Sequence, residues 1–197
     1  GELNGTIQDE QGKLPINDLV GDNGEFNAQV RQVLERLLAH PDLGLEEEKI
    51  EPLMQALKDW LDPDDDPTGE FGAETLFYQT EGKSYGCSNG PLQSLKELLL
   101  VRGMTSELFY GTEDAVGLKD LLTVHTMDAV NINTAGPAIL AAMVNPSVRM
   151  ETAREFARAA IDYRQDSRHF EYLSESDWYR NRVAGYNDIQ LPGDLVA

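Results

Sequence analysis

Two stretches in the first third of the chain carry apolar residues at the three- and four-residue spacing of an amphipathic helix. The first begins near Asn23 and ends at His40-Pro41, and its apolar face consists of Phe26, Val30, Val33, Leu34, Leu37 and Leu38. The second runs over residues 45–61, and its apolar face consists of Ile50, Leu53, Met54, Leu57 and Trp60. Because each apolar face must be covered by other elements, the pattern predicts a core built from several helices.

The rest of the chain adds short helices and a small β portion. Helices are predicted over residues 92–101, 105–109, 117–122, 137–143 and 152–163. Near the start, a strand over 3–7, a turn over 9–12 and an extended Leu14-Pro15-Ile16 predict a hairpin. The predicted fold class is therefore mostly α (α+β). We expect these side chains in the core: Leu57, Trp60, Leu95, Leu98, Leu121, Ile132, Leu140 and Phe156.

The long segment over residues 62–90 is poor in periodicity and rich in aspartate, glycine and proline. Residues 59–74 contain seven acidic side chains and no basic one, and such carboxylates repel one another unless a cation binds or water separates them. Five acidic residues are the candidate metal ligands: Asp62, Asp64, Asp65, Asp66 and Glu74. Two interpretations stay open here, a calcium-binding loop and a solvated acidic loop.

The spacing within this segment resembles calcium chemistry without matching the best-known calcium motif. Asp62, Asp64 and Asp66 alternate as ligands 1, 3 and 5 of a calcium loop do. However, Pro67 replaces the glycine of the helix–loop–helix motif, and Glu74 falls at position 13 instead of 12. An oxygen-rich loop of this kind suits calcium, which takes six to eight hard oxygen ligands.

Composition excludes several classes of function. The 16 basic and 35 acidic residues give a formal charge of 16 − 35 = −19, which opposes binding to nucleic acid or anionic lipid. The single cysteine, Cys87, excludes an intrachain disulfide and a cysteine-rich zinc site. His40, His125 and His169 lack metal-ligand spacing, and no nucleophile or phosphate-loop motif is present. We therefore expect no enzyme, and a calcium-dependent hydrolase is kept as an alternative.

Residues 131–170 resemble helix-hairpin-helix modules, some of which bind DNA. The pattern runs from Asn131-Ile132-Asn133-Thr134-Ala135 through Pro137 to His169-Phe170. DNA binding by such a module needs a glycine hairpin whose N–H groups meet phosphate, and the connection over 144–148 contains a proline and no glycine. We therefore expect a packing role, with Thr134 or Asn133 capping a helix. A nucleic-acid-binding module is the remaining alternative.

Several motifs together resemble one family. They occur in the order Ile7 to Leu19, Asp59-Trp60-Leu61-Asp62-Pro63-Asp64-Asp65-Asp66-Pro67, Gly72-Ala73-Glu74, Asn89-Gly90-Pro91-Leu92 and Asn131 to Ala135. This series is similar to the K-type minor pseudopilins of the bacterial type II secretion system, also called general secretion pathway protein K. The resemblance covers nearly the whole chain.

The resemblance implies a fold in which a helical domain is inserted into a pilin-like β-sheet. Residues 1–24 would belong to the pilin-like portion, 25–190 to the inserted helical domain, and 191–197 to the return or tail. The helical domain would contain helix-hairpin-helix (SAM-like) pieces. The chain has no run of about 18 apolar residues and no initiating Met, so we expect a soluble fragment of a longer protein.

The resemblance also implies a function. Members act as the non-enzymatic tip subunit of the periplasmic pseudopilus, together with the I- and J-type minor pseudopilins, and bind structural calcium in the helical domain. Secreted proteins are further candidate partners, and nucleic acid is not a partner. The longer parent protein would be periplasmic and anchored in the inner membrane by an N-terminal helix that this chain lacks.

Overall fold

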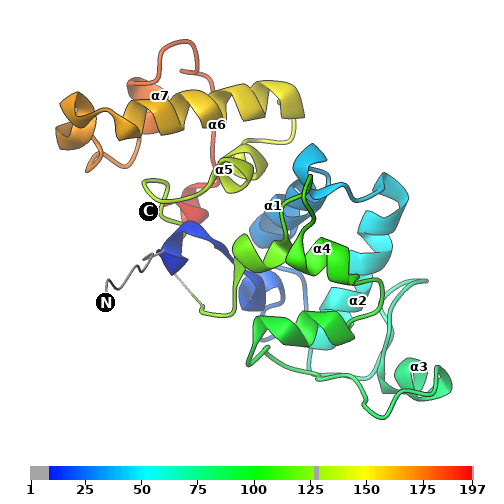
Figure 1. The fold of residues 1–197 in the computed structure, drawn as a ribbon. Helices are drawn as coiled ribbons and strands as arrows, with labels where there is room; N and C mark the ends of the chain where they lie inside the picture. The colour runs from blue at the N-terminus through cyan, green and yellow to red at the C-terminus, as the bar shows by residue number, and fades with distance from the viewer. Residues whose placement is uncertain (1–8, 127–128, 197) are drawn as a thin grey trace, which may run out of the picture.

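The computed structural model describes residues 9–126 and 129–196, and within them the fold is mostly helical (Figure 1). The α-helices are α1 (Ala28–Leu38), α2 (Ile50–Leu61), α3 (Thr75–Thr80), α4 (Ser106–Tyr110), α5 (Pro137–Met143), α6 (Met150–Gln165) and α7 (Trp178–Asn181). Short 3-10 helices span Glu10–Gly12, Ile16–Leu19, Pro41–Leu43, Glu47–Lys49, Leu95–Leu100, Leu118–Asp120, Ser167–Tyr172 and Gly193–Leu195. The prediction of a mostly α fold is therefore confirmed.

The first two predicted helices are confirmed with adjusted starts. The side chain of Asn27 accepts hydrogen bonds from the N–H groups of Gln29 and Val30, so α1 begins at Ala28. The second helix begins with a 3-10 turn and continues as α2 from Ile50. The two apolar faces are buried except at their first residues, Phe26 and Ile50, which are half-buried.

For the later helices, some predicted ranges match the structure and others do not. The predicted range 137–143 matches α5, and α6 extends 152–163 by two residues at each end. The segments 92–101 and 117–122 contain only 3-10 helices, and α3 forms inside the predicted irregular segment. Short apolar runs do not by themselves distinguish α from 3-10 geometry, because the choice depends on the neighbours they pack against.

The expected cap of α5 is wrong. Its N-cap is Gly136, which makes no side-chain cap hydrogen bond. The Asn133 amide instead accepts a bond from Trp178 Nε1 at 2.9 Å and donates one to Leu173 O at 3.0 Å, which ties the approach of α5 to α7. The Thr134 hydroxyl donates to Asp9 Oδ2 at 2.7 Å. Tertiary partners thus take the side chains that the sequence suggested as caps.

The expected hairpin near the start is only partly described. Its first strand, over 3–7, lies outside the described residues, and the turn at Glu10–Gly12 is present with Asp9 capping it. The second arm is β1 (Leu14–Pro15), which pairs in parallel with β2 (Leu122–Thr123), Leu14 opposite Leu122. β1 therefore joins a distant segment, because Leu14 and Ile16 are fully buried among the helices.

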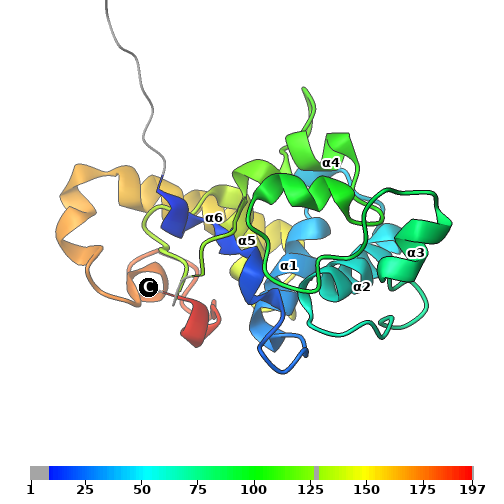
Figure 2. The same ribbon diagram turned by 90° about the horizontal axis from the view of Figure 1, so that it is seen from below.

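The buried apolar residues form one continuous core that includes β1, the helices and Leu195. Seven of the eight side chains expected in the core are at most 7% exposed, and Leu95, on a 3-10 helix at the surface, is half-buried. α5 packs against both α1 and α6, and it connects the part of the core around α1 and α2 with the part around α6 and α7. Figures 1 and 2 agree in placing α3 at the edge of the molecule, far from α6.

Consecutive backbone amides hold the two described ends of the chain side by side. Asn131 N donates to Gln11 O, and Val130 N donates to Leu195 O, both at 2.8 Å. Gly12 is required here, since a Cβ at this position would lie 2.8 Å from the carbonyl carbon of Thr134. The boundaries at 24/25 and 190/191 remain a prediction from the resemblance.

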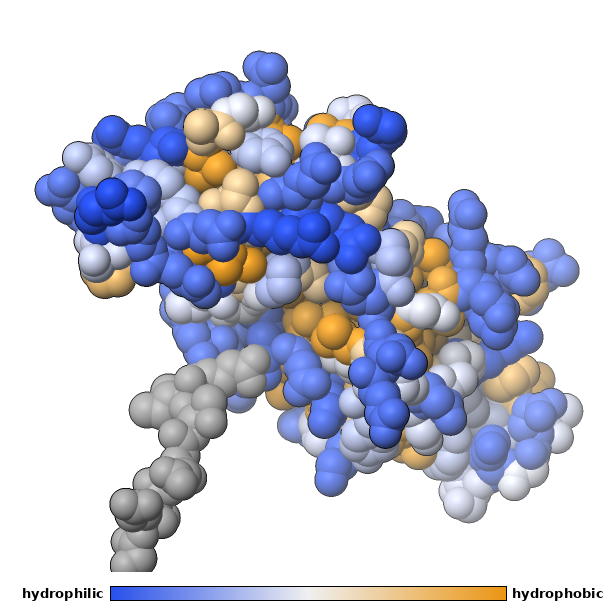
Figure 3. All heavy atoms as spheres, turned by 45° about the horizontal axis from the view of Figure 1, so that its top comes forward, coloured by the Kyte–Doolittle hydropathy of each residue, from blue (hydrophilic) through white to orange (hydrophobic). Residues whose placement is uncertain are grey.

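The face seen in Figure 3 is mainly hydrophilic, with apolar residues in small separate groups. Among the described residues, no helix has the length and apolar character needed to cross a membrane.

Candidate functional site

Three buried carboxylates meet where α2 ends and the acidic loop, residues 62–74, returns to α3. They belong to Asp59, Asp62 and Glu74, which are 0%, 0% and 3% exposed. One oxygen of each lies within 4.8 Å of the others. We call these three residues the carboxylate cluster. Asp59 and Asp62 lie three positions apart, which places both on one side of the last turn of α2.

The Asp59 carboxylate organises the acidic loop from within. Its Oδ2 accepts a hydrogen bond from Ala73 N at 2.6 Å, and its Oδ1 accepts one from Thr68 N at 3.0 Å. Gly72 passes so close that any side chain there would collide with the carboxylate and with the backbone of Thr68. Glycine is therefore needed at position 72, because the backbone there passes close to Asp59 and Thr68.

Asp62 has one paired oxygen and one unpaired oxygen. Its Oδ2 accepts a bond from Lys58 Nζ at 2.7 Å, one turn earlier on α2. Its Oδ1 is buried and has no hydrogen-bond partner in the described part of the chain. Burial raises the pKa of this carboxyl, while the Lys58 ammonium opposes the rise.

Glu74 is the least satisfied member of the cluster. It is the N-cap residue of α3, yet its side chain makes no cap hydrogen bond. Among residues 9–126 and 129–196, neither Oε1 nor Oε2 has a hydrogen-bond partner of standard geometry, and the nearby Cys87 thiol, a weak donor, opposes the rise of the Glu74 pKa. Burial, and then the charges of Asp59 and Asp62, raise the pKa of Glu74 from 4.5 to about 7. A buried carboxylate without donors is costly to ionise unless a positive charge is supplied.

The cluster fits a divalent cation in charge, donor type and spacing. Three carboxylates against one lysine leave a formal charge of about −2 when all are ionised. The unpartnered atoms are all hard oxygens, which calcium prefers at about 2.3–2.6 Å. Two oxygens on opposite sides of such an ion are about 4.6–5.2 Å apart, which is compatible with the 4.8 Å limit of the cluster.

The structure separates the five candidate ligands predicted from the sequence. Asp62 and Glu74 lie in the carboxylate cluster, whereas Asp64, Asp65 and Asp66 are exposed on the acidic loop. Asp64 Oδ1 accepts the N–H of Asp66 at 2.8 Å, and Asp65 Oδ1 accepts the Asn89 amide at 3.0 Å. In this arrangement the three exposed aspartates shape the loop, and the expectation that they bind metal stays a prediction.

Two residues, one in the cluster and one bonded to the acidic loop, were not among the candidates. Asp59 is a charged residue on α2, whose other inward-facing residues are apolar. It is fully buried because the acidic loop folds over it. Asn89 follows the loop with a positive φ of 47°, and its Oδ1 is a further buried oxygen without a described partner. The spacing Asp59-x-x-Asp62 could have suggested the first residue, but nothing local suggested the second.

Other groups hold the loop in place. Arg102 Nη1 donates to the carbonyl oxygens of Phe71 and Gly72 at 3.1 and 3.3 Å, and the guanidinium lies 4.5 Å from the ring centroid of Phe77. Gln55 Oε1 accepts the N–H of Phe71 at 2.8 Å. The loop is therefore anchored on α2 and on the segment after Leu100, although it is rich in glycine and proline.

Cys87, His40 and His169 have structural positions, whereas His125 is exposed. Cys87 Sγ donates to Asp59 O at 3.1 Å, and burial raises the pKa of the thiol to about 12. His40 is buried, and its Nδ1 accepts the N–H of Asp42, which caps the turn Pro41–Leu43. His169 stacks on Tyr163 with ring centroids 3.9 Å apart.

The connection between α5 and α6, over residues 144–149, packs against α1. Arg36 on α1 donates to Ala141 O, Pro146 O and Val148 O, the last at 2.8 Å. This side chain ties the connection to α1, and no glycine lies between residues 144 and 148. The arrangement offers none of the glycine N–H groups with which a helix hairpin binds phosphate.

A family model and the similar proteins of known family all name the same family. A model of the family "Type II secretion system (T2SS), protein K" matches residues 12–116, which is more than half of the chain. The chain is 37% identical over 144 residues to the type II secretion system protein K of Pseudomonas aeruginosa, covering 73% of this chain and 40% of that protein. It is 33% identical over 171 residues to the protein K of Klebsiella pneumoniae, covering 83% of this chain and 50% of that protein. The chain thus spans about half or less of the length of these relatives.

A solved structure agrees with the sequence relatives. The fold matches a chain in the crystal structure of the GspK–GspI–GspJ complex from the enterotoxigenic Escherichia coli type 2 secretion system, with a TM-score of 0.58. The match has 24% sequence identity and covers 69% of this chain and 48% of that chain, so it supports the fold. Together with the family match over residues 12–116, these similarities establish that the chain belongs to the type II secretion system protein K family.

Proposed function

We propose that this chain is the helical part of a non-enzymatic minor pseudopilin, which assembles with I- and J-type minor pseudopilins at the tip of a type II secretion pseudopilus. The observation that carries this proposal is the family match over residues 12–116. The similar solved chain is part of a complex named for K, I and J subunits, which supports the choice of partners. In the longer parent protein, we place this part in the periplasm, with anchoring in the inner membrane.

The partner proposal is tested by co-purification. The full-length protein without its membrane anchor is mixed with the soluble domains of the I- and J-type subunits and analysed by size-exclusion chromatography. We expect one complex that contains all three chains. Separate elution at micromolar concentrations of each protein would contradict the assignment of partners.

We further propose that the carboxylate cluster binds a structural calcium ion. Asp62 Oδ1 and both oxygens of Glu74 support this assignment, since they are buried and otherwise lack partners. Asp59 is a further ligand, and Asn89 Oδ1, loop carbonyls and the exposed aspartates of the loop are candidates to complete six to eight oxygens. Calcium would replace the missing donors and remove the repulsion among the three carboxylates.

A bound ion would stabilise the acidic loop and hence the packing of α3 against α2. Ordering a loop costs about 1–2 kcal/mol per residue in backbone entropy, and this loop has little apolar surface with which to offset that cost. At a free calcium concentration one hundred times the dissociation constant, binding adds about 2.7 kcal/mol to the unfolding free energy. Magnesium should substitute poorly, because it requires a tight octahedron and retains its water.

Thermal unfolding with calcium, magnesium or chelator tests this site. The informative variant is Asp62→Asn, and the matched control is Glu70→Gln, which changes an exposed carboxylate of the same loop that is not among the candidate ligands. We expect calcium to raise the midpoint of wild type and of the control, and to have a much smaller effect on Asp62→Asn. If chelator leaves the wild-type midpoint unchanged and calorimetry detects no binding at millimolar calcium, the acidic loop is solvated and holds no ion.

A further inference from the structure

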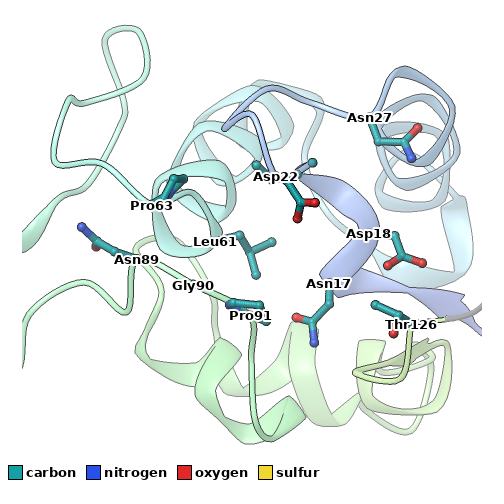
Figure 4. Close-up of a pocket in the computed structure, with 12 residues that line it drawn as sticks. Asn17, Asp18, Asp22, Asn27, Leu61, Pro63, Asn89, Gly90, Pro91 and Thr126 are labelled. Atoms are coloured by element: carbon teal, nitrogen blue, oxygen red, sulfur yellow. The ribbon is translucent and has the colours of Figure 1, made fainter.

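A hollow beside the carboxylate cluster, which does not include the cluster's three carboxylates in its lining, lies between the turn after β1 and the segment Asn89–Pro91. It has a volume of about 530 Å³, and we call it the Asp22 hollow. Its apolar side is formed by Leu61, Pro63 and Pro91, and its rim carries Asp18 and Asp22 (Figure 4). No lysine, arginine or histidine is among its described lining residues.

Most of the amide groups around the hollow are already used within the fold. The Asn17 side chain donates to Leu92 O and Val124 O and accepts the N–H of Leu92. The Asn27 side-chain oxygen caps α1. These bonds tie both amide side chains to the fold, and the carboxylate of Asp22 is the rim group that a ligand could meet.

Asp22 is the carboxylate that could pair with a ligand. It is exposed, and no hydrogen bond or ion pair of its side chain is found within the described ranges. In Figure 4 its carboxylate is directed into the hollow, above Leu61 and Pro91. A ligand that is complementary to this hollow has a positively charged hydrogen-bond donor, which pairs with Asp22. It also has an apolar stem, which contacts the apolar side of the hollow.

We infer that the Asp22 hollow is a docking site for a lysine or arginine side chain of a partner protein. Such a side chain lays its methylene groups along apolar surface while its charged end stays at a polar rim, which matches the order of groups here. The chain's charge of −19 would also attract a basic surface over distance. This inference does not depend on the calcium proposal.

The site can be tested by NMR on the ¹⁵N-labelled chain in about 0.15 M salt, where charges beyond about 8 Å are largely screened. The probe is N-acetyl-lysine methylamide, and the neutral comparison is N-acetyl-norleucine methylamide, which has a similar stem without the ammonium group. We expect the lysine probe to shift amide signals of residues 17–22, 61–63 and 89–91, and the norleucine probe to shift them much less.

Two variants and one control locate the interaction. Asp22→Asn should weaken lysine binding by up to about fivefold, the contribution of one exposed ion pair. Gly90→Phe should block the hollow, since a side chain there meets nothing closer than Ser88 O at 4.0 Å. Asp114→Asn removes an exposed carboxylate outside the hollow and should bind the probe as wild type does.

Four results would overturn the inference: shifts centred on residues 64–74, equal weakening by Asp22→Asn and Asp114→Asn, equal binding of the norleucine probe, or no shift at any probe concentration. A fifth comes from a calcium titration. If calcium alone produces the same shifts around Asp22 and displaces the probe, the hollow is a metal site and does not accept a side chain. A sixth comes from a free polyamine: if it binds at least tenfold more tightly than N-acetyl-lysine methylamide, the occupant is a small molecule.

Discussion

Replacing Glu74 by glutamine should stabilise the calcium-free protein and remove most of its response to calcium. The reason lies in the surroundings of this side chain, which is buried beside Asp59 and Asp62 and has no described hydrogen-bond donor of standard geometry. Without a cation, the ionised carboxylate is an uncompensated buried charge. Glutamine has nearly the same shape, carries no charge, and brings an NH₂ group that can donate to the neighbouring carboxylates.

The magnitude follows from the pKa of Glu74, which rises from 4.5 to about 7 on folding. As pH increases, the unfolded chain loses this proton first, so the unfolding free energy falls between about pH 4.5 and pH 7. Above pH 7 the full penalty is present, and it amounts to about 3 kcal/mol. For a chain of this size, that corresponds to roughly 10 °C in the melting temperature.

The assay is thermal and urea unfolding of wild type and Glu74→Gln in chelator at pH 8 and at pH 4.5, and again with calcium at pH 8. The variant should be more stable than wild type in chelator at pH 8, and this advantage should disappear at pH 4.5. Calcium should reverse the order, because the variant lacks one carboxylate ligand. Glu70→Gln, an exposed change in the same loop, should behave as wild type in every condition. Equal stability of Glu74→Gln and wild type in chelator at pH 8 would refute the reasoning.

Three further substitutions probe the frame of the molecule. Arg102→Ala removes two bonds to loop carbonyls and should lower the unfolding free energy by about 1–3 kcal/mol, measured by urea denaturation; an unchanged midpoint would show that the loop does not depend on it. Asn17→Ala removes three bonds that join separate segments and should cost a similar amount, about 1–3 kcal/mol, in the same assay. Gly12→Ala should cost about 1–3 kcal/mol because its Cβ meets the backbone of Thr134, whereas Gly193→Ala, with open space around it, should stay within about 0.5 kcal/mol.

Local periodicity was sufficient to predict the helical class and much of the core. The apolar faces of α1 and α2 follow from three- and four-residue spacing, because that spacing alone determines which side chains share a face of a helix. Proline at the first position of α5 likewise marks its start. These features depend only on neighbours in the sequence, so a single chain without any comparison contains them.

Long-range pairing could not be predicted in this way. β1 was expected as one arm of a hairpin whose other arm lies outside the described residues, and its pairing with β2 far along the chain was not expected; the burial of Leu14 and Ile16 accompanies this pairing. Asn133 was expected to cap a helix, yet it binds Trp178. In both cases the local preference is small, and a buried tertiary contact outweighs it.

The acidic residues show the same division at the candidate site. The sequence by itself identified an oxygen-rich loop and named Asp62 and Glu74 among its candidates, because carboxylate density is a local property. Only the tertiary structure decided which carboxylates are buried together, by folding the loop back over α2 so that Asp59 joins Asp62 and Glu74 while Asp64 stays in water. The physical reason is that desolvation depends on every segment packed around a group, and spacing along the chain carries no information about segments that are distant in sequence.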